Sequence, residues 1–424
     1  MYSNFTPKKV AKVSSKMEKE TPEITNWVDT LNQIIEDLSE SKTSSNREEL
    51  LETLVHILAN HHASPQIESR LEEILGLLKR SLLKNSSTNE ACLASKAIAL
   101  TFINMEDISE SESDDLYRRI LPSLRNRIKD SEQVDIKISC LQTLSLITYT
   151  AASDIDKQLA RDYLFNFIET DGADFNVSDL SSTGLDNLFS KVLQAYGLLF
   201  AASFTTGLVD FDILWEELEK VMPVHEMLLE NRDKDIRISA GENVGLIFET
   251  ANNFWSSDSD SDDDGEEEPV KPEYDNIDGL IYTLKELSID SSRRRAKSDR
   301  AEQRAVFRDV VKSVEENVKP TEELKIGGKI LTFRGWAKIL PLNAFRHILG
   351  QGFQHHLKTN DMMEAILRYS IGRQQQDSDD SGDEVGFDRS TLRKVDRKFI
   401  DDENKKSRIK QLRKARLRKE KPTC

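Results

Sequence analysis

Glycine and proline are scarce in this chain: its 424 residues include 17 glycines and 10 prolines. Sheet proteins need frequent turns, and turns rely heavily on these two residues, so strand-and-turn architectures are disfavoured. Hydrophobic residues make up 38% of the sequence and charged residues 32%. This composition is typical of a helical chain with sizeable segments that are too polar to fold, and not of one dense core.

Long apolar runs are absent as well. No stretch approaches the roughly eighteen consecutive apolar residues of a membrane-spanning helix, so we expect no membrane partner. The first residues lack the apolar region of a secretory signal. They also contain Glu18, Glu20 and Glu23 and no arginine, which argues against a mitochondrial transit peptide. We therefore predict an intracellular protein.

Cysteine is rare, and its spacing matches no metal or redox motif. Cys92 and Cys140 lie in apolar helical patterns and are predicted to be plain buried thiols. The third cysteine, Cys424, is the last residue of the sequence. The rarity of cysteine predicts a reducing location.

Motifs that carry catalysis or bind cofactors are also missing. The stretch IGGK at Ile326 lacks the spacing of a phosphate-binding loop, and GQG at Gly350 follows no parallel strand. The pairs His61–His62 and His355–His356 are adjacent, and neighbours on a helix point about 100° apart, which suits a metal poorly. The sequence therefore predicts no enzyme, no cofactor, no metal site and no small-molecule substrate.

An internal repeat is the strongest positive signal. DIKISCLQTLSLI, starting at Asp135, and DIRISAGENVGLI, starting at Asp235, share most of their pattern. Weaker copies start at Ala91 and Asn187, so the starts lie 44, 52 and 48 residues apart. Helical-pair solenoids of the HEAT and armadillo kind repeat every 40–47 residues or so. Chance similarity between amphipathic helices is the alternative interpretation.

Small residues on each copy favour close packing of neighbouring helices. These residues are Ser95, Ala97, Ala99, Ser139, Ala240 and Gly245. The pairs Asp135–Lys137 and Asp235–Arg237 are expected to form a charge ladder between repeats. One repeat cannot bury its own apolar face, so the copies must stack. We predict an all-α, armadillo/HEAT-like helical-repeat solenoid with a small C-terminal domain and a basic helical tail.

The changing composition predicts the domain boundaries. LKIGGKILTF is predicted to be a hairpin around Gly327–Gly328, followed by two helices separated by Gly350–Gly352. The predicted segments are a disordered N-terminus (1–22), a helical-repeat domain (23–320) interrupted by an acidic loop (256–272), a C-terminal domain (321–373), an acidic linker (374–388) and a basic tail (389–424).

Two acidic inserts, residues 256–269 and 377–385, are too highly charged to fold. They contain serines followed closely by acidic residues, a context that suits acidophilic kinases. Phosphorylation would deepen the negative charge; a solvated loop without a regulatory role is the alternative. The candidate phosphorylation sites are Ser256, Ser257, Ser259, Ser261, Ser378 and Ser381.

The charge of the chain is unevenly distributed. Its formal net charge is −16, but the segment from Arg389 to Lys421 carries fifteen basic and five acidic residues. That segment therefore has a net charge of +10, and the remainder has −26. An acidic body with one basic arm can bind a polyanion that a uniformly acidic surface would repel.

The basic arm ends in a segment of helical composition, residues 402–421, with few apolar residues to dock on a core. Like charges four residues apart disfavour the free helix, so we predict that it becomes ordered on a polyanion. RNA and a nuclear import receptor both fit this composition. The candidate RNA-binding residues are Lys405, Lys406, Arg408, Lys410, Arg413, Lys414, Arg416, Arg418 and Lys419.

Two stretches resemble the interferon-related developmental regulator family. The first is AEQRAVFRDVVKSVEE, and the second, FRHILGQGFQHHLKTN, follows shortly after Trp336. The two acidic inserts and the N-terminus depart from the family's pattern. The residues that carry the resemblance are Arg304, Phe307, Arg308, Asp309, Trp336, Leu349, Gly350, Gly352, His356, Leu357 and Asn360.

The resemblance implies a helical-repeat protein without enzymatic activity. It implies a factor that binds ribosomes, through ribosomal RNA and proteins, and holds them translationally inactive, with the basic helix entering an RNA-lined channel. It also implies a second role, nuclear co-regulation of transcription, in which the solenoid binds regulatory proteins. The expected location is therefore cytoplasmic with a nuclear pool.

Overall fold

The computed structural model describes residues 26–41, 43–84, 87–106, 108–175, 182–205, 211–258, 272–289, 297–326, 329–367 and 370–372. The predicted N-terminal segment, the acidic linker and the basic tail lie outside these residues. Most of the first acidic insert does too. Within the described ranges, no helix is long and apolar enough to span a membrane.

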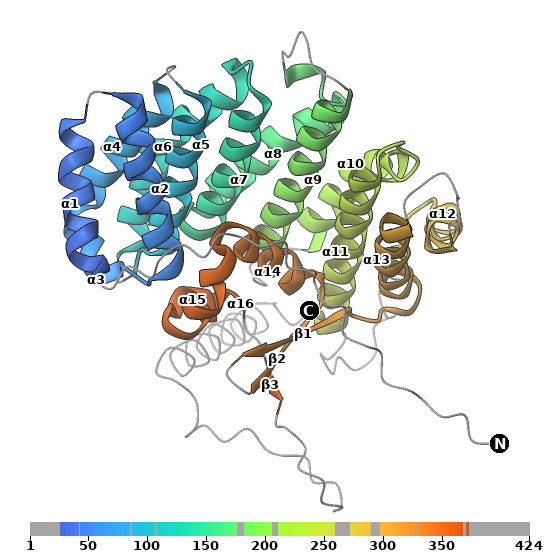
Figure 1. Ribbon diagram of the computed structural model, residues 1–424. Coiled ribbons are helices and arrows are strands. Elements are labelled where there is room, and N and C mark those ends of the chain that lie inside the picture. Colours follow the sequence, from blue (N-terminus) through green and yellow to red (C-terminus); the bar gives the residue numbers. More distant parts are fainter. Residues whose placement is uncertain are drawn as a thin grey trace, which may run out of the picture.

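Helices stack in two layers along the chain, each outer helix packing on the inner helix that follows it (Figure 1). The inner helices are α2 (Ser44–Asn60), α5 (Thr88–Ile103), α7 (Val134–Ala151), α9 (Ser182–Phe204), α11 (Lys234–Asp258) and α13 (Lys297–Glu316). The outer helices are α1 (Trp27–Glu40), α4 (Leu71–Leu83), α6 (Glu110–Asp130), α8 (Asp154–Glu169), α10 (Phe211–Leu228) and α12 (Ile277–Ile289). Short helices α3 (Ser64–Ile67), η1 (Glu68–Arg70) and η2 (Ala173–Phe175) lie in connections.

The four repeat copies all lie on inner helices, namely α5, α7, α9 and α11. These helices pack side by side in chain order, so the predicted all-α helical-repeat solenoid is confirmed. Small residues bring neighbouring inner helices close together. Ser139 Oγ of α7 donates to the main-chain oxygen of Cys92 on α5 at 3.2 Å, and Ser95 Oγ donates to Thr143 Oγ1 at 2.9 Å.

The predicted charge ladder is in the wrong place. Lys137 of α7 does not bridge to the next repeat; its Nζ donates to the main-chain oxygens of Ile128 and Lys129 at the end of α6. Arg237 of α11 donates to three carbonyls that follow α10, including that of Asn231 at 2.7 Å. Lys137 therefore satisfies carbonyl groups that the end of α6 leaves without helical partners, and Arg237 bonds to carbonyl groups of the turn between α10 and α11.

Ion pairs between repeats connect outer helices, and at Arg47–Glu90 and Lys234–Glu302 they connect inner helices as well. Glu72 of α4 pairs with Arg119 of α6 at 2.5 Å, and Asp162 of α8 pairs with Lys220 of α10 at 3.0 Å. The side chains of these two outer pairs are exposed, and exposed pairs contribute little stability. Packing of the apolar inner and outer faces therefore holds the array together.

The C-terminal described residues add a small sheet and a helical segment. Strands β1 (Thr321–Ile326) and β2 (Lys329–Arg334) form the predicted hairpin, and β3 (Ser370–Gly372) pairs with β2 in an antiparallel arrangement. Between β2 and β3 lie α14 (Trp336–Leu349), the 3₁₀ turn η3 (Gly350–Gly352), α15 (Phe353–Thr359) and α16 (Asp361–Leu367). The prediction of two helices missed the break between α15 and α16 at Asn360.

We call residues 335–367 the strap, because they cross the inner layer of the solenoid (Figure 1). Helix α14 packs on α5, α9 and α11, and η3 and α15 pack on α2. Strap residues Phe345 and Leu357 are buried in the same apolar cluster as the inner helices. The strap thus connects the first repeats to the last ones.

Candidate functional site on the inner face

The predicted RNA-binding residues, from Lys405 to Lys419, lie outside the described part of the chain. Ser259, Ser261, Ser378 and Ser381 do as well. Ser256 and Ser257 fall in the last turn of α11, where the backbone alone is described. The described structure therefore brings none of the predicted site residues together.

One end of the strap is fixed by a carboxylate from the solenoid. Helix α14 begins after Gly335, which offers no side chain to cap it. Glu249 of α11 replaces that cap: its carboxylate accepts from the main-chain nitrogens of Trp336 at 2.8 Å and Ala337 at 3.4 Å. Burial raises the pKa of Glu249, and these two hydrogen bonds oppose that rise.

The other end of the strap is bonded to the carbonyl ends of two inner helices. His356 Nε2 lies 3.1 Å from the main-chain oxygen of Leu58 on α2, and Asn360 Nδ2 donates to that of Ile103 on α5 at 2.7 Å. Gly352 touches α2 so closely that an added Cβ would lie 1.8 Å from Ala59 O. Several residues that carried the family resemblance are thus contacts of the strap.

Histidines gather where the strap meets α2. The His61 and His355 rings lie 6.2 Å apart, and the His62 and His356 rings lie 6.0 Å apart. Burial, followed by nearby His62, lowers the pKa of His356 to about 4, so this imidazole is neutral at physiological pH. Among the described residues, no group of three or more His, Cys, Asp or Glu side chains is arranged to hold a metal.

The two cysteines in the described part of the chain, Cys92 and Cys140, show no sign of chemical activation. Burial raises the pKa of Cys140 to about 12 and that of half-buried Cys92 to about 11. The prediction of a buried thiol is confirmed for Cys140, while Cys92 is partly accessible.

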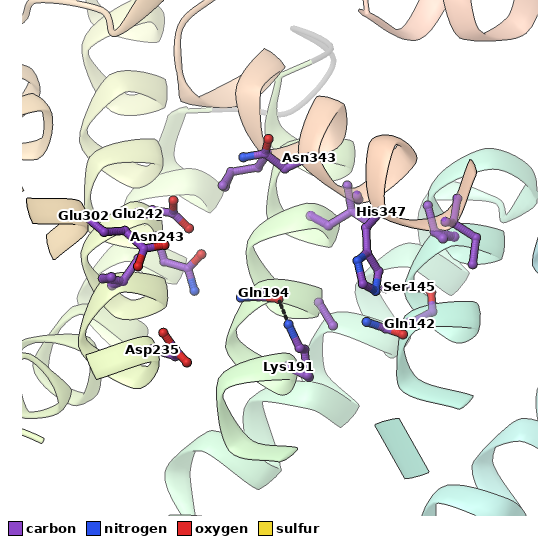
Figure 2. A pocket seen from close by; sticks show the side chains of 17 residues that line it. Gln142, Ser145, Lys191, Gln194, Asp235, Glu242, Asn243, Glu302, Asn343 and His347 are labelled. Atoms are coloured by element: carbon purple, nitrogen blue, oxygen red, sulfur yellow. Dashed lines mark hydrogen bonds between the residues drawn. The ribbon is translucent and has the colours of Figure 1, made fainter. Parts of the chain in front are cut away.

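A cavity of about 310 Å³ lies between α14 and the inner helices; we call it the inner pocket (Figure 2). Its polar lining comes from five helices, and its apolar lining comes mainly from leucines and alanines. The polar residues are Gln142 and Ser145 of α7, Lys191 and Gln194 of α9, Asp235, Glu242 and Asn243 of α11, Glu302 of α13, and Asn343 and His347 of α14.

The charges of the inner pocket are divided between its two ends. Asp235, Glu242 and Glu302 come from α11 and α13, whereas Lys191 comes from α9. The imidazole of His347, whose pKa is lowered by burial, lies on the side of Lys191 (Figure 2). Burial, and then Glu302, raises the pKa of Glu242 to about 7. Burial lowers the pKa of Lys191, which donates to Gln194 Oε1 at 2.9 Å.

The inner pocket was missed in the sequence, although a signal for it exists. Gln142, Gln194 and Glu242 occupy the same position in three repeat copies, seven residues after each start. All three line the inner pocket. Polar residues that recur at one position of successive inner helices indicate a shared surface of the solenoid. Most other positions of these helices are apolar and buried against neighbouring helices.

The two-layered array defines an all-α helical-repeat protein. A profile of the interferon-related developmental regulator (IFRD) family matches residues 4–315. The chain therefore belongs to the interferon-related developmental regulator family. The match ends before the strap, so the family assignment depends on the solenoid and not on the C-terminal motif.

Individual relatives agree with the profile. The chain is 26% identical over 334 residues to interferon-related developmental regulator 1 of Sus scrofa, covering 78% of this chain and 69% of the relative. It is 26% identical over 331 residues to interferon-related developmental regulator 2 of Mus musculus, covering 77% and 69%. An uncharacterized protein of Schizosaccharomyces pombe is 26% identical over 379 residues, covering 85% of this chain and 79% of that protein.

Proposed function

We propose that this protein is a non-enzymatic ribosome-binding factor that holds ribosomes translationally inactive. The observation that carries the proposal is the charge division of the chain. The segment from Lys405 to Lys421 contains ten basic residues among seventeen, while the rest of the protein is strongly acidic. Membership of a family of regulators is consistent with this role.

The acidic solenoid alone is poorly suited to RNA, because phosphates would be repelled by its net charge. The basic tail supplies the RNA contacts. Its arginines suit ribosomal RNA, since a guanidinium group pairs with phosphate and stacks on bases. As a helix, its last twenty residues would span roughly 30 Å, enough to enter a channel while the solenoid stays outside.

The proposed mechanism is steric exclusion. The tail occupies space in the ribosome that messenger or transfer RNA needs, and the solenoid contacts ribosomal surfaces outside the channel. The strap keeps the array in one shape, since it joins α2 to α11. The protein acts mainly in the cytoplasm, and its tail also allows a nuclear pool.

Sedimentation of the tagged protein through sucrose gradients of cell lysate tests this proposal. Full-length protein is expected to move with ribosomal particles and to be released as salt rises, because phosphate contacts are lost with counterion release. A chain ending at residue 401 is expected to stay at the top of the gradient. A full-length protein that stays at the top at every salt concentration, in growing and starved cells alike, would overturn the proposal and favour a nuclear scaffold.

A further inference from the structure

The inner pocket contains polar groups without partners in the described structure. The Gln142 carboxamide, the Glu242 carboxylate and the His347 imidazole make no hydrogen bond or ion pair with any other described residue. Asp235 and Glu302 differ, because both pair with Lys234, at 3.3 and 2.7 Å. Glu242 is therefore the carboxylate of the inner pocket that has no ion pair, although the nearby charge of Lys191 acts to lower its pKa.

Glu242 is half-buried, so an opposite charge placed beside it would be screened less than at a free surface. The pocket lies next to Lys191, but that ammonium group is directed to Gln194. A lysine or arginine side chain entering from outside would remove the energetic cost of ionising Glu242.

The carboxamides suit a peptide main chain. Each Gln side chain can both donate and accept a hydrogen bond, as a peptide unit requires. Gln142 and Gln194 lie at the same register of neighbouring helices, which typically pack about 8–10 Å apart. Three residues of extended chain span about 10 Å. Carboxamides at this spacing would contact every third residue of a peptide that runs along α14.

We propose that the inner pocket binds an extended peptide segment of a partner protein, with a lysine or arginine of that segment seated against Glu242. Gln142, whose carboxamide has no partner among the described residues, holds the main chain of the peptide. Gln194 and Asn343, which already bond to Ser239 and Arg346, contribute their remaining hydrogen-bonding positions. Leu146 and Leu198 provide apolar contact for its other side chains. This surface is separate from the basic tail, so the proposal does not depend on ribosome binding.

A phage library of random nonapeptides, selected on the full-length protein, tests the proposal. Selected sequences are expected to share one Lys or Arg at a fixed position. The synthetic consensus peptide is then expected to bind Glu242→Lys about tenfold or more weakly than wild type, because a charged hydrogen bond is lost and a like charge is added. Gln142→Ala should weaken binding by a smaller factor, and because Gln142 is only half-buried the substitution should cost little stability.

Glu216→Lys is the matched control, since Glu216 is exposed on outer helix α10 and the change of charge is the same. Binding to this control should equal that of wild type. If Glu216→Lys weakened peptide binding as much as Glu242→Lys does, the change in net charge alone would explain the loss, and the proposal would be overturned. Selected peptides without a basic residue, or with affinity insensitive to both Glu242→Lys and Gln142→Ala, would overturn it as well.

A competition experiment separates a partner from the chain's own tail. A synthetic peptide of residues 405–421 is added to the complex of protein and consensus peptide. Under the proposal, it displaces the consensus peptide no better than a scrambled consensus peptide does. Displacement at matching concentrations, together with tighter consensus binding to a chain ending at residue 401, would identify the tail as the occupant and contradict the partner assignment.

Discussion

Glu249 and Trp336 are 87 residues apart in the chain, yet the Glu249 carboxylate accepts from the main-chain nitrogen of Trp336 at 2.8 Å. The Trp336 indole nitrogen in turn donates to Ser313 Oγ of α13 at 2.9 Å. Gly245 leaves the space for this indole: an added Cβ would lie 2.6 Å from Trp336 Nε1. One residue of the strap is thus bonded to the last two inner helices.

Removing the Glu249 cap should loosen α14. We expect Glu249→Ala to lower the free energy of unfolding by about 2 kcal/mol, because a tertiary cap is lost and two main-chain donors stay buried. Hydrogen exchange should increase across residues 336–349 before other helices respond. Glu249→Gln retains an acceptor and avoids ionising a buried carboxyl, so its effect should be smaller. Equal effects of both substitutions would contradict the capping role.

Gly352→Ala should displace the strap from α2. The added Cβ would lie 1.8 Å from Ala59 O, and forced overpacking typically costs about 1–3 kcal/mol. Thermal melts measure the loss of stability. Gly76→Ala is the control, since a Cβ on Gly76 meets nothing within 4 Å and alanine favours the helix. Destabilisation by Gly76→Ala that matches Gly352→Ala would show that strap contact is not the cause.

The inner pocket should give the stability a defined pH dependence. The pKa of Glu242 rises from 4.5 to about 7 in the folded chain. Between these two values the folded state retains a proton that the unfolded state has lost, so the free energy of unfolding falls as pH rises. Glu242→Gln should remove this slope and, at pH above about 7, stabilise the protein by on the order of 1 kcal/mol.

Denaturant titrations at several pH values measure that slope. Glu216→Gln, at an exposed position of α10, should leave it unchanged. A Glu242→Gln curve parallel to the wild-type curve from pH 4.5 to pH 7 would mean that Glu242 ionises normally.

Arg47 and Glu90 should behave as one buried unit between the first two repeats. Arg47 Nε lies 2.8 Å from Glu90 Oε1, and both side chains are almost fully buried. Removing either partner strands a buried charge, so Arg47→Met and Glu90→Gln should each cost about 3–5 kcal/mol. The double substitution should cost less than the sum by about 1–3 kcal/mol. Strict additivity in chemical denaturation would rule out direct coupling.

Local sequence patterns predicted the solenoid because its contacts follow the chain. The copies beginning at Asp135 and Asp235 belong to α7 and α11, and the Gly327–Gly328 hairpin forms where its composition indicated. Contacts of the strap escaped prediction, because His356 meets a carbonyl 298 residues earlier. No short repeating pattern in the sequence predicts a contact between residues so far apart in the chain.

The error over Lys137 and Arg237 has a physical cause. Opposite charges two residues apart suggested pairing between repeats, but each cation follows an outer helix, where main-chain carbonyls of the helix end or of the next turn accept its hydrogen bonds. Arg47 likewise follows an outer helix, α1, and donates to the main-chain oxygen of Leu38 in that helix at 2.9 Å. The position of the cation just after a helix end was the more informative signal.

Exclusion of messenger RNA from ribosomes is the central claim, and competition measures it most directly. Purified ribosomes are mixed with a fluorescent messenger RNA fragment and increasing protein, using wild type and a variant with Arg408, Arg413, Arg416 and Arg418 changed to Gln. Wild-type protein should displace the fragment, and the variant should not. Binding of wild-type protein and messenger RNA to the same ribosome, with no loss of fluorescence anisotropy, would contradict the account.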